Sequence, residues 1–248
     1  MTNASRLTRI AAAAAVALLA LPFIGLLAEI EWTRLGELLT SDVLLAAFRV
    51  TAIVVPIATI VVVVVGTPLA WLLARYDAPW MRPIRALVLV PIVLPPVISG
   101  LVLLSAFGRQ GLLGGALDSI GIVLPFSLAG TALTATFVSL PFYVLAVEAG
   151  FRDVPQANLE AGRSLGISES RELSQIAIPH ARGAIGAGVL LAAARALGEF
   201  GATITFAGNV EGATRTLPLA TFAALENDPA LARVIGLVLV AIAAAVIY

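Results

Sequence analysis

The sequence predicts an all-α protein that crosses a membrane about six times. Of its 248 residues, 60% are hydrophobic and 12% are charged, and the mean hydropathy of +1.04 lies well outside the range of soluble domains. Six stretches of mostly apolar residues are long enough to cross a hydrocarbon core of about 30 Å as helices. We therefore expect residues 1–248 to form a single membrane-spanning domain.

The six predicted spans follow one another along the whole chain. They cover 10–28, 47–74, 84–107, 123–149, 183–207 and 231–248. Arg6 and Arg9 precede the first span as in a signal peptide, but its apolar run is longer than usual and no A-x-A cleavage pattern follows, so we expect a retained helix. The last span reaches Tyr248 with no polar flank, and we expect that the chain is cut short there.

Proline interrupts the second, third and fourth predicted spans. Each proline removes a backbone donor, which is tolerated at membrane depth where neighbouring protein or a water-filled cavity satisfies the freed carbonyls. This pattern favours a transporter over a simple anchor. The prolines are Pro56, Pro68, Pro91, Pro95, Pro96, Pro125 and Pro141.

Arginine is distributed unevenly between the two sets of polar segments that separate the spans. Nine arginines lie in the set that holds the N-terminus and the 150–182 loop, and five lie in the other set. The positive-inside rule predicts that the first set is cytoplasmic and that 208–230 lies on the outer side.

Missing residue types exclude several kinds of chemistry. All fifteen basic residues are arginine, cysteine is absent and His180 is the only histidine. Without lysine there is no P-loop, and without cysteine there is no thiolate chemistry or Cys-rich zinc site. A serine nucleophile such as Ser99 or Ser139 lacks a nearby base. We predict no catalytic residue, metal or cofactor, and the zero net charge argues against nucleic-acid binding.

The 150–182 loop carries signals for two short helices. Pro155 suits the first turn of a helix, Gly166 a left-handed C-terminal cap, Ser168 the next N-cap and Pro179 a stop. Two acidic residues favour the positive end of the second helix, namely Glu169 and Glu172. A helix-turn-helix in the cytoplasm is expected.

This loop resembles the EAA loop of ABC importer permeases, whose pattern is E-A-A, three residues, G, nine residues and I-x-L-P. The matching residues are Glu160, Ala161, Gly166, Ile176 and Pro179, and the departures are Gly162 and Ile178. The resemblance implies a coupling helix that docks in a groove of a separate ATPase subunit. The alternative is a solvated connector with no partner.

Two opposite charges lie in the middle of the fifth predicted span. Arg195 and Glu199 are four positions apart and hence on one helical face. A central arginine costs about 2.5–3.5 kcal/mol, so this helix should lie against protein or a watery path. The pair either grips a neighbouring helix or a second copy, or lines the pathway. Neutral donors follow toward the outer side at Thr203, Thr205 and Asn209.

The segments 194–209, 212–220 and 94–104 resemble the molybdate-transporting branch of these permeases. The resemblance implies a homodimer in the bacterial inner membrane, two copies of an ABC ATPase, a periplasmic or lipoprotein oxyanion-binding protein and molybdate as substrate, with tungstate as a second candidate. Two alternatives stay open. One is a sulfate or thiosulfate permease, and the other is a proton-coupled carrier that uses Glu148 or Glu199.

Overall fold

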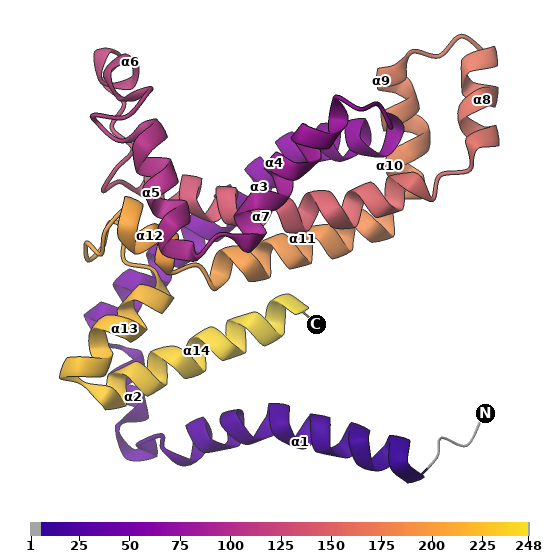
Figure 1. The fold of residues 1–248 in the computed structure, drawn as a ribbon. Helices are drawn as coiled ribbons and strands as arrows, with labels where there is room; N and C mark the ends of the chain where they lie inside the picture. The colour runs from indigo at the N-terminus through magenta and orange to yellow at the C-terminus, as the bar shows by residue number, and fades with distance from the viewer. Residues whose placement is uncertain (1–5, 248) are drawn as a thin grey trace.

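The computed structural model describes residues 6–247, and every element in that range is helical (Figure 1). The longer helices are α1 (Arg6–Ala28), α3 (Asp42–Arg75), α4 (Met81–Val93), α5 (Pro96–Phe107), α7 (Leu128–Arg152), α8 (Gln156–Ser164), α11 (Arg182–Leu197), α13 (Leu217–Asn227) and α14 (Pro229–Ile247). The shorter ones are η1 (Trp32–Arg34), α2 (Leu35–Leu39), α6 (Gly114–Ser119), α9 (Glu169–Arg171), a π-helical turn (Glu172–Ala177), α10 (Ile178–His180) and α12 (Gly201–Phe206). The all-α prediction is confirmed.

The centre of the molecule is a layer in which α7 packs between α3 and α11. Tyr143 of α7 is fully buried there, and its hydroxyl lies 2.7 Å from the hydroxyl of Thr67 on α3. Three of the four buried residues of α11 are small, as expected for close helix packing: Gly188, Ala192 and Ala196.

The helical layer has two ends that carry different elements. We call the end that carries residues 76–80 and the 150–182 loop the α8 end, and the opposite end, which carries α2, α6 and α13, the α6 end (Figure 1). The 34 residues of α3 run between them and measure about 51 Å at 1.5 Å per residue, longer than a hydrocarbon core.

Within residues 6–247, four helices are long and apolar enough to cross a membrane unbroken: α1, α3, α7 and α14. The bent pair 169–180 and 182–197, which turns by 81°, gives a fifth candidate. The chain is thus a multi-pass membrane protein. Of the predicted runs, the third and fifth are each divided in two.

The division of the third run has a local cause. Leu94 is extended between α4 and α5, and Pro95 and Pro96 follow it. A proline lacks the N–H that continues a helix and disfavours helical geometry in the residue before it, so the run could not be one helix. The fifth run breaks at 198–200, between α11 and α12.

The fourth helix begins later than the expected 123. Pro125 lies in the preceding loop, Phe126 has a positive φ of 58°, and Ser127 caps α7 by accepting a hydrogen bond from the Gly130 N–H at 3.0 Å. The helix therefore starts at Leu128.

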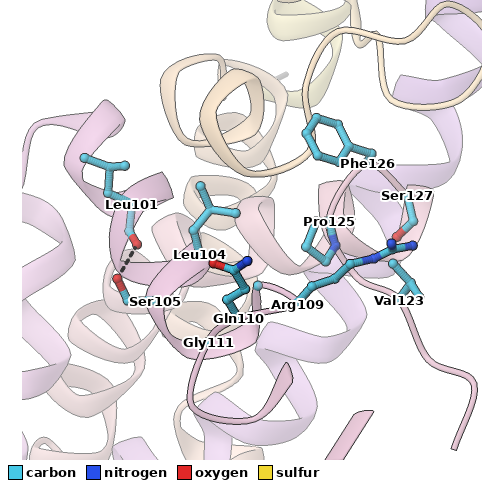
Figure 2. Close-up of a pocket in the computed structure, with 11 residues that line it drawn as sticks. Leu101, Leu104, Ser105, Arg109, Gln110, Gly111, Val123, Pro125, Phe126 and Ser127 are labelled. Carbon is cyan, nitrogen blue, oxygen red and sulfur yellow. Dashed lines mark hydrogen bonds between the residues drawn. The ribbon is translucent and has the colours of Figure 1, made fainter. Parts of the chain in front are cut away.

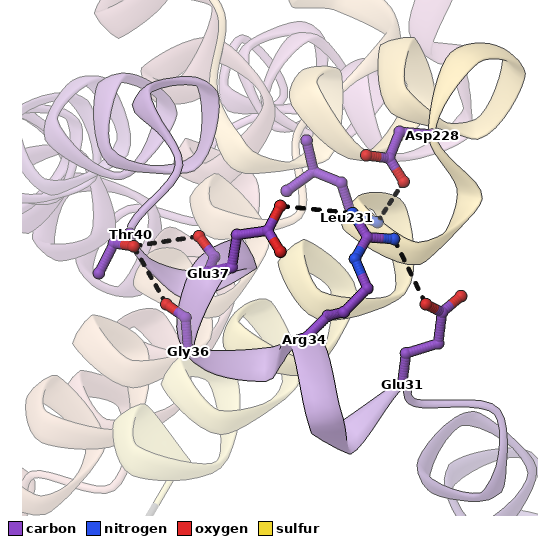
Figure 3. A network of polar contacts seen from close by, with 7 residues as sticks. All are labelled: Glu31, Arg34, Gly36, Glu37, Thr40, Asp228 and Leu231. Carbon is purple, nitrogen blue, oxygen red and sulfur yellow. Dashed lines mark hydrogen bonds and ion pairs between the residues drawn. The ribbon is translucent and has the colours of Figure 1, made fainter.

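The first helix is attached to the rest mainly near its C-terminal end. No residue of α1 is buried, and Arg233 of α14 forms an ion pair of 3.0 Å with Glu29 just beyond α1. Figure 3 shows the adjoining corner, where Arg34 lies 3.3 Å from Glu31 and 3.5 Å from Glu37. The expected end of the sixth span at Tyr248 lies outside the described residues.

Candidate functional site

The 150–182 loop forms the predicted helix-turn-helix at the α8 end. Gly166 has a φ of +75° in the turn after α8, a conformation that side chains other than glycine rarely adopt, so its predicted capping role is confirmed. Pro155 lies at the N-cap of α8, one residue before the expected first turn. Ser168 occupies the next N-cap, but its hydroxyl lies 3.1 Å from that of Ser170 and does not cap the backbone.

The five residues that match the EAA pattern do not share one surface. Four of them are exposed, namely Glu160, Ala161, Gly166 and Pro179. Ile176 is half-buried and faces α8 at Gly162, where an added Cβ would lie 2.9 Å from the Ile176 Cδ1 atom and 2.7 Å from the Ile167 Cδ1 atom. The glycine that departs from the pattern thus lets the second helix pack closely on the first.

The apolar residues of this loop divide into an inner and an outer set. Leu159 is buried against the helical layer, whereas Leu165 at the turn is 83% exposed. Leu165 therefore leaves a large apolar side chain uncovered at the tip of the loop, next to the tight Gly166 turn.

Glu172 is not the exposed helix-end charge that the sequence suggests. It starts the π-helical turn, and its side chain is only 4% exposed. The Arg163 Nε donates a hydrogen bond of 2.9 Å to Glu172 Oε1, and the Arg75 Nη2 lies 3.6 Å from Oε2. Because Arg75 is the last residue of α3, this carboxylate connects the 150–182 loop to the end of α3.

Tyr76 adds a second contact between the same elements. Its hydroxyl donates to Glu169 Oε1 at 3.1 Å, and this hydrogen bond to a carboxylate raises the pKa of the Tyr76 phenol. A cavity of about 500 Å³ lies among these groups, with Arg163, Ile167 and Glu172 on its wall.

Glu148 has a similar environment one helix away. Its side chain on α7 is 9% exposed, and its Oε1 lies 3.0 Å from Arg152 Nε and 2.9 Å from Arg85 Nη2. Both arginines also donate through Nη2 to the carbonyl of Leu73, at distances of 3.0 Å for Arg85 and 3.1 Å for Arg152. A carbonyl in the last turn of a helix lacks an intrahelical partner and carries the negative end of the dipole, so two cations stabilise it well.

Sequence reasoning missed both networks. Arg75 and Glu172 are far apart in the sequence, as are Leu73 and Arg152, and no helical spacing relates them. The only local signal is the four-residue spacing of Glu148 and Arg152 on α7.

The two divided runs meet near their breaks. An added Cβ on Gly201 of α12 would lie 2.6 Å from the Pro96 Cβ of α5, and one on Gly100 would lie 2.9 Å from the carbonyl oxygen of Ala202 and 2.5 Å from the Thr205 Cβ. Only glycine permits this approach, so α5 and α12 form one tightly packed pair.

Arg195 and Glu199 form the predicted ion pair at this break, with 2.8 Å between Arg195 Nη1 and Glu199 Oε2. The expectation of a continuous helix was wrong, because α11 ends at Leu197 and Glu199 lies in the break. From there its Oε1 accepts a hydrogen bond of 2.7 Å from the Ala202 N–H, which the break leaves without a helical partner. Glu199 is 2% exposed and Arg195 is 27% exposed, so the cation is the accessible member.

The neutral donors predicted near this pair have different surroundings. Thr203 is buried, and its hydroxyl lies 3.0 Å from that of Thr134 on α7. The Thr205 hydroxyl donates to the Gly201 carbonyl at 2.9 Å. Asn209 lies beyond α12, where its Oδ1 accepts a hydrogen bond from Arg215 Nε at 2.9 Å. It is therefore separate from the other predicted residues of this group, which lie on α11, in the break or on α12.

A further cavity of about 950 Å³ opens at the α6 end between α5 and the loop segments 108–111 and 123–127 (Figure 2). Its wall is mostly apolar, and Arg109 reaches across it toward Ser127. None of the predicted site residues lines it, and it is remote from the 150–182 loop.

Comparisons with known proteins match almost the whole chain. Residues 66–248 match the family model described as "Binding-protein-dependent transport system inner membrane component". The molybdenum transport system permease protein ModB of Mycobacterium tuberculosis is 37% identical over 246 residues, which cover 99% of this chain and 93% of that protein.

Two relatives from Escherichia coli give the range of similarity. The molybdenum permease protein ModB of strain K12 is 38% identical over 183 residues, which cover 73% of this chain and 80% of that protein. The sulfate transport system permease protein CysT of the same strain is 32% identical over 217 residues, which cover 87% of this chain and 78% of that protein.

Proposed function

Because the chain belongs to the family of binding-protein-dependent transport system inner membrane components, we propose that it is the permease subunit of an ABC importer for molybdate. The observation that carries the proposal is the match along nearly the whole chain to a molybdenum permease, at 37% identity. The sulfate permease CysT is less similar, at 32%. Tungstate has the same shape and charge as molybdate and is a second candidate substrate.

The importer is assembled from several chains. This chain has no lysine and therefore no P-loop, so the ATP must be hydrolysed by a partner subunit. We place two copies of the permease with two ATPase subunits and one periplasmic or lipoprotein oxyanion-binding protein. The family description, which specifies dependence on a binding protein, supports the last of these partners.

The 150–182 loop is the docking site for the ATPase within this proposal. Exposed Glu160 offers a charge and exposed Leu165 an apolar anchor for a groove, while Gly166 sets the turn between the helices. Ala161 and Pro179 lie on the exposed surface, and half-buried Ile176 fixes the spacing of the two helices.

The α8 end faces the cytoplasm in this arrangement, as does the N-terminus. The excess of arginine in the segments at this end supports the orientation, and the inner membrane is the proposed location. The helical layer and the loop act as one domain, because the loop is joined to α3 by ion pairs and buried apolar contacts.

The break between α4 and α5 and the break between α11 and α12 are the proposed elements of the pathway. A tetrahedral dianion requires a cation or neutral donors at membrane depth, and the accessible side of Arg195 supplies the former. Glu199 keeps Arg195 in place between transport events. Thr203 and Thr205 support the same break, and Asn209 positions Arg215 at its outer side.

ATP hydrolysis by reconstituted complexes distinguishes molybdate from sulfate as the substrate. Binding protein loaded with molybdate should stimulate ATP hydrolysis by the complete importer, while the same protein offered sulfate should not. Sulfate is the second candidate because of the CysT match. Stimulation by sulfate alone would transfer the assignment to a sulfate permease.

A further inference from the structure

The last turn of α3 is the point at which four elements are joined by buried charge. We call this group the α3 joint; it consists of Leu73, Arg75, Arg85, Glu148, Arg152 and Glu172. One side reaches the 150–182 loop through Arg75 and Glu172, at 3.6 Å. The other reaches α4 and α7, through two arginines that donate to the Leu73 carbonyl.

From these contacts we infer that Arg75 and Arg85 are positioning residues that transmit the movement of the 150–182 loop through the end of α3 to α4. The inference rests on the proposed function, because it assigns a task to residues of an ATP-driven importer. Neither residue belongs to the α4–α5 or the α11–α12 break, where the pathway is proposed. Their task is to hold α4, and thereby the α4–α5 break, in a fixed relation to the loop on which the ATPase acts.

The electrostatics explain why this joint is rigid. Glu148 and Glu172 are almost fully buried, and a buried carboxylate without a partner is costly, so each keeps its arginines close. Each carboxylate has two arginines. One of them comes from its own helix or loop, and the other comes from the neighbouring element.

This duplication lets one link be removed without leaving a bare buried charge. In Arg85→Gln, Glu148 keeps Arg152, and α7 stays attached to the Leu73 carbonyl, while α4 loses the polar contacts of Arg85 and keeps its apolar ones. In Arg75→Gln, Glu172 keeps Arg163, while the loop loses its ion pair with α3. Both variants should therefore fold.

The two arginines act in series in this account. Loss of the ion pair between the loop and α3, or of the polar link between α3 and α4, interrupts the same chain of charged contacts, so the second change should add little to the first. Independent defects would instead multiply. A matched control is Arg82→Gln, because Arg82 is exposed on α4 and no ion pair to it is found among residues 6–247.

The first experiment measures ATP hydrolysis by the reconstituted importer with molybdate-loaded binding protein. We expect Arg75→Gln and Arg85→Gln each to lower the stimulation by roughly 2- to 30-fold, the range for residues that link coupled sites, without loss of ATPase binding. The double variant should lose no more stimulation than the more strongly impaired of the two single variants. Arg85→Lys should retain at least half of the wild-type stimulation. Singles that equal Arg82→Gln, or a double variant whose loss is the product of the singles, would overturn the inference.

The second experiment needs neither substrate nor transport, so its failure is distinct from failure of the proposed function. The chain has no cysteine, so spin labels at Leu87→Cys on α4 and Ser170→Cys in the loop would be the only two in each copy, and dilution with unlabelled permease restricts the measurement to one copy. The distance distribution between them should be narrow with Arg85 present and broad in Arg85→Gln. An equally narrow distribution in both would show that α4 is held by other contacts.

Discussion

Replacing Glu199 by glutamine should destabilise the protein through the charge that it leaves behind. Two contacts change in this variant. The amide oxygen can still accept the Ala202 N–H, but a neutral hydrogen bond is about 1 kcal/mol weaker than one to a carboxylate. Arg195 in turn loses its partner at 2.8 Å, within a helix that lies at membrane depth.

The size of the second effect follows from the position of the arginine. An unpaired central arginine costs about 2.5–3.5 kcal/mol, and the partial exposure of Arg195 reduces this to roughly 2 kcal/mol. Glu199→Gln should therefore lose about 3 kcal/mol in all. At about 2–4 °C per kcal/mol for a chain of this size, the melting temperature should fall by roughly 6–12 °C.

A double variant distinguishes charge from packing. Arg195→Met together with Glu199→Gln removes the unpaired cation and should regain about 2 kcal/mol relative to Glu199→Gln alone. The control is Glu211→Gln, which breaks an ion pair of the same 2.8 Å length and the same spacing, with Arg215, but whose carboxylate is 51% exposed and whose arginine keeps a hydrogen bond to Asn209. It should cost under about 1 kcal/mol.

The assay is thermal unfolding of the purified chain in detergent, followed by the change in near-ultraviolet circular dichroism. We expect the wild type to be the most stable, the double variant to be intermediate and Glu199→Gln to be the least stable. A double variant that melts at or below Glu199→Gln would refute it, because the loss would then come from packing and not from the uncompensated charge.

Three further outcomes follow from the contacts described above. Leu165→Asp should weaken binding of the ATPase subunit by about 30-fold, the loss typical of a buried anchor, whereas Leu112→Asp at the α6 end should leave it unchanged; equal affinity for both would contradict a docking role. Gly100→Val should cost about 1–3 kcal/mol by forcing α5 from α12, so an unaltered melting temperature would be inconsistent with their close packing. Glu169→Gln should lower the pKa of the Tyr76 phenol toward its ordinary value, as measured by absorbance titration. Because the pKa is raised in the folded protein, the contact between Tyr76 and Glu169 contributes fully to stability below the ordinary pKa of tyrosine. This contribution is lost as the pH rises through the raised pKa.

Local patterns predicted the elements that depend on local chemistry. The apolar runs identified α1, α3, α7 and α14, because burial in lipid requires nothing beyond length and composition. Gly166 was identified as a helix cap because only its own backbone angle is involved. The break at Pro95 and Pro96 could have been read from the same residues, since two prolines cannot continue a helix.

The remaining features depend on residues that the sequence keeps far apart. Glu172 carries a local helix-end signal, yet its side chain is buried in an ion pair with Arg75, which lies on α3. The approach of Gly100 to Thr205 likewise exists only once two broken helices are placed together. The break at 198–200 contains no proline, and the sequence reads as a continuous apolar helix across it.

In the proposed importer, this chain carries molybdate inward at the expense of ATP hydrolysed by another subunit. The most direct measurement is uptake of radioactive molybdate into liposomes that hold the permease with its ATPase subunit, with ATP inside and the binding protein outside. The account predicts accumulation only when both ATP and binding protein are present, and none from a proton gradient alone. Uptake that follows the proton gradient without ATP would contradict it and would favour a secondary carrier.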